Sequence, residues 1–126
     1  MTFIFFMQKT FNILKKHFEI SLKESLKKNK KIEEFENIRK NIIVPSSKEE
    51  FGDYQSNVCL ILSKIYGQQP RLIATEIIDK VNKNQEIIDC VEKLEIAGPG
   101  FINIKLKEKI FIDNLINNLK CSRIGI

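Results

Sequence analysis

The chain has 126 residues, of which 43% are hydrophobic and 29% are charged. That length and composition are typical of one globular domain and exclude a fibrous or wholly disordered chain. No apolar run approaches the ~20 residues that cross a membrane, and the opening residues lack a signal-peptide pattern. We therefore expect a cytoplasmic, monomeric protein without a membrane segment. Three widely spaced cysteines argue against a disulfide framework and favour reduced thiols.

The charge balance is basic and uneven. Lysine and arginine together number 21 against 16 acids, which gives a net charge of +5. Eight lysines but only two acids, Glu19 and Glu24, lie between Lys9 and Lys31. Such a segment is either a helix that faces phosphates or an ordinary solvated helix face.

Helical periodicity dominates the first two-thirds of the chain. A helix is expected from Thr10 to the lysine cluster at 27–31, and a weaker one over 32–38. The apolar stripe of the first of these helices recurs at three- and four-residue steps through Phe11, Leu14, Phe18, Leu22 and Leu26. A further helix, marked by Val58, Leu62 and Ile65, should end at Gly67, and another should start at Pro70.

The remaining segments indicate strands. Two short strands are expected at 41–44 and 51–54, and the apolar period changes to two from Cys90 onward. Gly98-Pro99-Gly100 predicts a type II turn with proline at the first central position, joining that segment to a strand over 101–106. A last helix is expected over 107–120, with Ile112, Leu115, Ile116 and Leu119 facing inward.

Strands in hairpin-capable pairs, with helices between and around them, favour an α+β fold. We expect a small four-stranded antiparallel sheet with helices packed mainly on one face, as a single domain over residues 1–126.

The sequence offers little catalytic chemistry. His17 is the only histidine, so no second one shares a metal with it, and a structural or surface role is favoured. No phosphate-binding glycine motif occurs, and no serine or cysteine lies in a nucleophile motif. We predict no catalytic residue, no metal site and no cofactor in this chain, which does not look like a complete enzyme.

The strand over 101–106 carries the positive signal. Alternation places Ile102, Ile104 and Leu106 on the core face, and therefore turns Phe101, Asn103 and Lys105 outward. A ring that stacks on a base, an amide that pairs with a base edge and an ammonium that neutralises a phosphate suit RNA. The alternative is that Phe101 packs under another element and that Asn103 is ordinary exposed polarity.

Two motifs resemble a known family. Gly52-Asp53-Tyr54-Gln55, followed by a helix, and Ala97-Gly98-Pro99-Gly100 with the strand after it are similar to paired motifs of the N-terminal additional domain of arginyl-tRNA synthetases. Pro70-Arg71 before Ile73-Ala74 fits the same pattern, and the core of the resemblance runs over residues 42–106.

The resemblance implies a domain that grips the outer corner of tRNA(Arg) and contacts the D-loop. The contacting aromatic and amide of the family map onto Phe101 and Asn103, and phenylalanine replaces the tyrosine of many relatives. For the residues of the two glycine motifs the resemblance implies structural roles, in which Asp53 caps the following helix and Gln55 bridges the sheet to that helix. These residues are Gly52, Asp53, Tyr54, Gln55, Gly98, Pro99 and Gly100.

The catalytic motifs of the family are missing. Neither an HIGH-like nor a KMSK-like motif occurs, so the catalytic and anticodon-binding domains, with their ATP and magnesium, are expected outside this chain. A chain of this kind is an excised domain, a fragment or a free-standing relative of arginine–tRNA ligase. The alternatives to tRNA binding are a protein-interaction module and an inactive truncated product.

Overall fold

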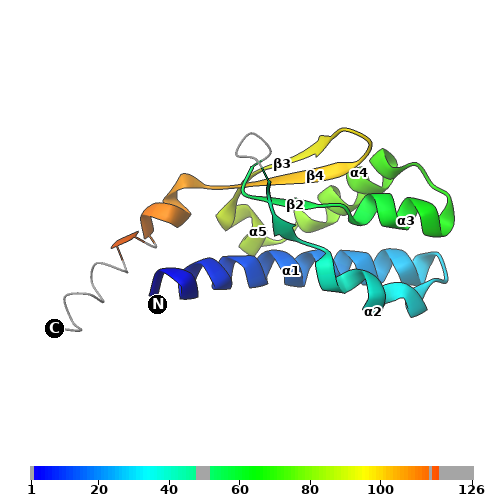
Figure 1. The fold of residues 1–126 in the computed structure, drawn as a ribbon, viewed down its shortest axis with the longest axis horizontal. Coiled ribbons are helices and arrows are strands. Elements are labelled where there is room, and N and C mark those ends of the chain that lie inside the picture. Colours follow the sequence, from blue (N-terminus) through cyan, green and yellow to red (C-terminus); the bar gives the residue numbers. More distant parts are fainter. Residues whose placement is uncertain (1, 48–51, 114, 117–126) are drawn as a thin grey trace.

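An antiparallel sheet covered by helices on one face forms the framework of the molecule (Figure 1). This computed structural model describes residues 2–47, 52–113 and 115–116. The four strands lie in the order β1-β2-β4-β3, and every neighbouring pair is antiparallel. The α+β fold with a four-stranded sheet, predicted from the sequence, is confirmed. The strands are β1 (Val44–Pro45), β2 (Tyr54–Ser56), β3 (Val91–Ala97) and β4 (Phe101–Leu106).

The helices lie on the core side of this sheet (Figure 1). α4 contacts both strands of the β3–β4 hairpin on one side and α1 on the other, so α1 forms a further layer behind it. The main helices are α1 (Thr2–Lys28), α3 (Val58–Tyr66), α4 (Pro70–Val81) and α5 (Gln85–Cys90). A short connection follows α1 and consists of η1 (Ile32–Glu34), α2 (Phe35–Ile38) and η2 (Arg39–Asn41).

The long helix α1 buries the stripe that the sequence predicts. Leu14, Phe18, Leu22 and Leu26 are all completely buried. The helix begins at Thr2 rather than at Thr10, and Thr10 is a buried residue within it. Ser21 and Ser25 are buried beside this stripe, and α1 packs against α4 and α5.

Local capping signals set the ends of α3 and α4 as expected. Gly67 ends α3 with a left-handed φ of 74°, and its N–H donates to the carbonyl of Ser63. Pro70 stands in the first turn of α4, where its missing N–H has no consequence for the helix.

The short strands and the last helix differ from the sequence-based expectation. The bounds of β1 and β2 lie one to three residues later than 41–44 and 51–54, and Phe51 lies outside the described residues. Residues 108–113 and 115–116 are helical, but Ile112, Leu115 and Ile116 are exposed instead of facing inward. Ile110 and Phe111 pack against the core in their place, and Leu119 lies outside the described residues.

Candidate nucleic-acid interface

The face of the sheet opposite the helices carries the predicted row of β4. Ile102, Ile104 and Leu106 are buried on the core face, at no more than 1% exposure. Phe101 and Asn103 alternate with them and face the other way, as does exposed Lys105. The predicted register of this strand is therefore correct.

Strand pairing builds rows of side chains across this open face. Asn103 lies between Gln55 of β2 and Glu95 of β3, while Lys105 pairs with Lys93. Phe101, which is half-buried, pairs with Ala97 next to the hairpin turn. An aromatic ring, an amide pair and an ammonium group thus lie in successive rows along one strand.

Asn103 is less accessible than its position on the open face suggests. The residue is only 8% exposed, and its Oδ1 accepts a hydrogen bond from Gln55 Nε2 at 2.9 Å. The alternation rule places it on the correct face, but the expectation of a freely exposed amide is wrong. Gln55 bridges two strands of the sheet rather than the sheet and a helix, so that predicted role is also corrected.

Acids outnumber lysines on and beside the open face. Lys93 Nζ lies 3.3 Å from Glu95 Oε2, and both side chains are more than half exposed. A pocket beside Lys105 is lined in part by the carboxylates of Asp53, Glu92 and Glu108. Stacking and hydrogen bonding, rather than a concentrated positive charge, are the interactions that this face offers to a partner.

The glycine motif before β2 fastens that strand to β4. Gly52 adopts φ of +93°, and a Cβ there would lie 2.7 Å from the carbonyl oxygen of Ile104, so only glycine fits. The Asp53 N–H donates to Ile104 O at 2.8 Å, and Asp53 Oδ2 accepts from the Leu106 N–H at 2.8 Å. Asp53 therefore clips β2 to β4 and does not cap α3, which corrects the role expected for it.

Tyr54 and Ser56 complete the structural part of the same motif. The Tyr54 ring faces the core side and lies 5.5 Å from the ring of Phe11 on α1. Burial, together with the Asp53 carboxylate, raises the pKa of Tyr54 above its ordinary value. At the start of α3, the Val58 N–H donates to Ser56 Oγ at 3.3 Å, so serine and not Asp53 satisfies this helix terminus.

The second glycine motif is the turn of the β3–β4 hairpin, where it meets α4. Gly100 N–H donates to Ala97 O at 3.2 Å, so Gly98 (φ +55°) and Pro99 are the central residues. The turn is one residue earlier than predicted, and proline holds the second central position. A Cβ on Gly100 would lie 2.5 Å from the Pro70 Cβ, and Arg71 Nη1 donates to Gly98 O. The Pro70-Arg71 motif thus anchors the turn.

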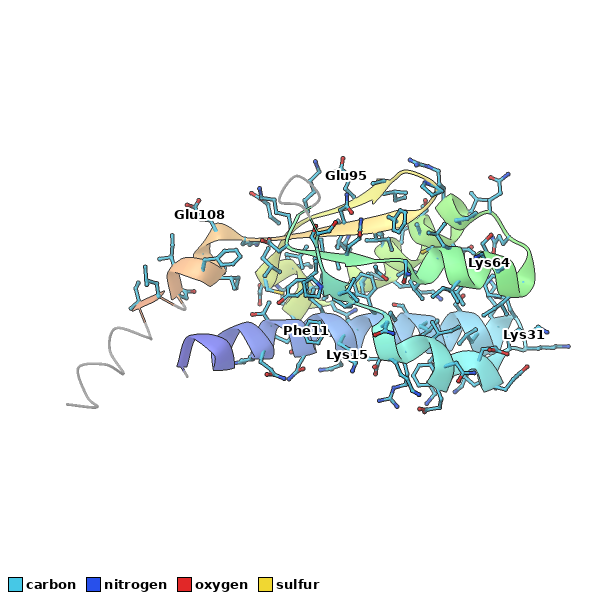
Figure 2. All side chains as sticks on the ribbon, viewed as in Figure 1. Phe11, Lys15, Lys31, Lys64, Glu95 and Glu108 are labelled. Carbon is cyan, nitrogen blue, oxygen red and sulfur yellow. The ribbon has the colours of Figure 1, made fainter. Side chains whose placement is uncertain are left out.

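The lysine-rich helix lies away from the open face. α1 packs behind α4 and α5, and its contact with Tyr54 is made on the core side of the sheet. Figure 2 shows Glu95 on the opposite side of the molecule from Lys15 and Lys31. The lysines of α1 therefore do not lie beside Phe101 and Asn103.

Other reactive groups have structural surroundings. His17 is 6% exposed and its Nε2 lies 3.0 Å from Glu86 Oε1, which also accepts from Lys16; these contacts lower the pKa of Glu86. Burial raises the pKa of the Cys59 thiol to about 12. Among the described residues, no group of three potential metal ligands occurs, and no helix is long and apolar enough to cross a membrane.

Comparison with known proteins decides the family. Residues 12–106 match the family described as the arginyl tRNA synthetase N terminal domain. The chain belongs to this family. The match begins within α1 and ends at the last residue of β4, so it includes the long helix from residue 12 onward as well as both glycine motifs.

Relatives in this synthetase family are much longer than the chain. It is 55% identical over 116 residues to an arginine–tRNA ligase of Prochlorococcus marinus, which covers 92% of the chain and 19% of that protein. It is 46% identical over 86 residues to an arginine–tRNA ligase of a Nostoc species, covering 68% of the chain and 14% of the relative. The enzyme of Rhodopirellula baltica is 38% identical over 85 residues, or 68% of the chain and 12% of the relative. The chain thus spans about a fifth or less of these relatives.

Proposed function

We propose that this synthetase domain binds tRNA(Arg) through the open face of its sheet, at the D-loop in the outer corner of the tRNA. The observation that carries the proposal is the row of β4, in which half-buried Phe101, the hydrogen-bonded Asn103 and exposed Lys105 lie on the uncovered face. The family match supports tRNA as the partner.

Each side chain of the row has a distinct task. The Phe101 ring stacks on an unpaired base, since base–aromatic stacking contributes about 1–3 kcal/mol per base. Gln55 holds Asn103 Oδ1, so Asn103 Nδ2 is the group directed to the base edge as a donor. Lys105 neutralises a phosphate next to that base.

Aminoacylation itself belongs to other segments. The relatives are named arginine–tRNA ligases, and the chain corresponds to 19% or less of them. Arginine activation, with its ATP and magnesium, and anticodon recognition would be carried out by the rest of such an enzyme in the cytoplasm. Arginine-dependent ATP–pyrophosphate exchange by the 126-residue chain above background would contradict this division.

A titration of fluorescent tRNA(Arg) transcript with the chain tests the proposal. Phe101→Ala should weaken binding by about 1–3 kcal/mol while the domain stays folded. Asn103→Ala should reduce discrimination between transcripts that differ at one D-loop base, because base contacts carry specificity. If the parent chain binds all D-loop variants equally and Phe101→Ala has no effect, the open face is a protein-binding surface or has no RNA function.

A further inference from the structure

Five exposed lysines gather at one end of the molecule, and we call this group the basic end. Four of them follow one another where α1 finishes, and the fifth comes from α3, which is tied to α1 by the Ser25–Tyr66 hydrogen bond of 2.7 Å. Figure 2 shows Lys31 and Lys64 at the same end of the molecule. The basic end consists of Lys27, Lys28, Lys30, Lys31 and Lys64.

The charge of this end is not cancelled by its surroundings. Within the described part of the chain, none of these five ammonium groups forms a salt bridge, whereas Glu24 on the preceding turn pairs with Lys80 at 3.6 Å. The carboxylates of Glu33, Glu34 and Glu76 lie on neighbouring elements. Five lysines against three carboxylates leave a net positive end, in contrast to the open face, on and beside which acids outnumber lysines.

Lys30 carries its charge at a backbone position that glycine usually occupies. α1 ends in a Schellman motif, in which Lys31 N–H donates to Leu26 O at 2.8 Å and Lys30 N–H to Lys27 O at 3.1 Å. Lys30 occupies the left-handed position of this motif, with φ of 58°. Glycine is the usual residue there because a Cβ is disfavoured in that conformation. Among the described residues, Lys30 is the one non-glycine with positive φ.

The basic end and the open face lie on different sides of the molecule, but both reach the same end of it (Figures 1 and 2). The hairpin turn next to Phe101 lies at the same end of the molecule as the end of α1, and α3 lies between them (Figure 1). Lys64 on α3 therefore stands between the open face and the lysines of α1 (Figure 2).

We propose that the basic end is a second contact site for RNA, which binds backbone phosphates while the open face reads bases. The inference rests on the proposed tRNA binding and adds the source of its electrostatic attraction. Phosphate contacts position a nucleic acid without reading its sequence, and each one adds about 0.7–0.9 to the slope of log affinity against log salt.

Lys30→Gly is the decisive variant, because it removes one positive charge and also removes the strain of a left-handed residue that has a Cβ. Its melting temperature should rise by about 2–5 °C, since the strained left-handed residue becomes glycine. Its affinity for tRNA(Arg) transcript should nevertheless fall by about 5- to 8-fold at 0.1 M salt, which is the contribution of one phosphate contact. The combined variant Lys27→Gln with Lys31→Gln should lower the salt slope by about 1.4–1.8.

Lys109→Gln is the matched control. Lys109 is exposed and neighbours Glu108, which Figure 2 places at the opposite end of the molecule. This substitution removes one positive charge without touching the basic end, so affinity and salt slope should stay within twofold and about 0.3 of the parent values.

The outcomes separate the two proposals. If Lys30→Gly is stabilised but binds tRNA like the parent, its charge only complements the end of α1 and the basic end is not an RNA site. If the lysine variants bind tRNA like the parent while Phe101→Ala binds weakly, the open face is supported as an RNA site and the basic end is refuted as one. The reverse result supports the basic end as an RNA site and refutes the open face as one. A parent chain that does not bind tRNA at about 50 mM salt refutes both proposals.

Discussion

The hydrogen bond between Gln55 and Asn103 predicts that removing one partner destabilises the domain more than removing the other. Asn103 is 8% exposed and its Oδ1 accepts from the Gln55 amide, which is itself half-buried. Gln55→Ala leaves a buried acceptor without its donor and should destabilise the domain by about 1–3 kcal/mol. Asn103→Ala leaves the Gln55 amide without its acceptor, but this donor still reaches water. Only the net free energy of the hydrogen bond, about 0.5–1.5 kcal/mol, is then lost. The more exposed partner should therefore be the costlier one to remove.

The measurement is thermal unfolding of both single variants and the double variant. For 126 residues, each kcal/mol corresponds to about 4 °C in melting temperature. Gln55→Ala should lower the melting temperature by about 4–12 °C and Asn103→Ala by about 2–6 °C. The double variant should be less destabilised than the sum of the two, because the single bond is lost only once, and the coupling energy should be about 0.5–1.5 kcal/mol.

Glu95→Ala is the control in the same row. Glu95 pairs with Asn103 across the strands, but its carboxylate makes only an exposed contact with Lys93. Its removal should change stability by less than about 0.5 kcal/mol. Strictly additive single variants, or a Gln55→Ala variant that melts like the parent, would show that the amide pair does not hold Asn103 in place.

Three other outcomes follow from the packing. Ile104→Ala, at a completely buried site, should lower the free energy of unfolding by about 2–5 kcal/mol in urea denaturation. Gly100→Ala should cost at least about 1–3 kcal/mol in the same assay, because φ is +144° and the added Cβ would meet Pro70 at 2.5 Å. Because burial raises the pKa of Cys59 to about 12, iodoacetamide at pH 8 should label that thiol only after denaturation, as peptide mass spectrometry would show.

Periodic segments with local caps were predictable from the sequence. The buried stripe of α1, the ends of α3 and α4 and the alternation of β4 all depend on residues within a few positions of one another. Each pattern is set by helix or strand geometry together with burial, so the residues themselves carry the information.

The missed features depend on contacts between distant segments. β1 and β2 contain two and three residues, too few for a period, and their ends are set by the pairing of β1 with β2 and of β2 with β4. Asp53 bonds to Leu106 and Gln55 to Asn103 across roughly fifty residues, so nothing near Asp53 signals that it clips a sheet instead of capping a helix. The position of α1 behind α4 likewise follows from packing and not from its lysine content.

The proposed division of tRNA binding between the open face and the basic end predicts how salt acts on recognition. In the proposed binding mode, the phosphates neutralised by the basic end would be common to every tRNA, whereas Asn103 and Phe101 would contact bases that differ between tRNAs. Raising the salt concentration should therefore weaken binding to all transcripts by the same factor and leave the affinity ratio between D-loop variants unchanged. Titrations of two such transcripts at about 50 and 200 mM salt measure this ratio. A ratio that falls with salt would mean that Lys105, the exposed cation on the reading face, contributes to base discrimination, and that charge and sequence readout are not separated in this domain.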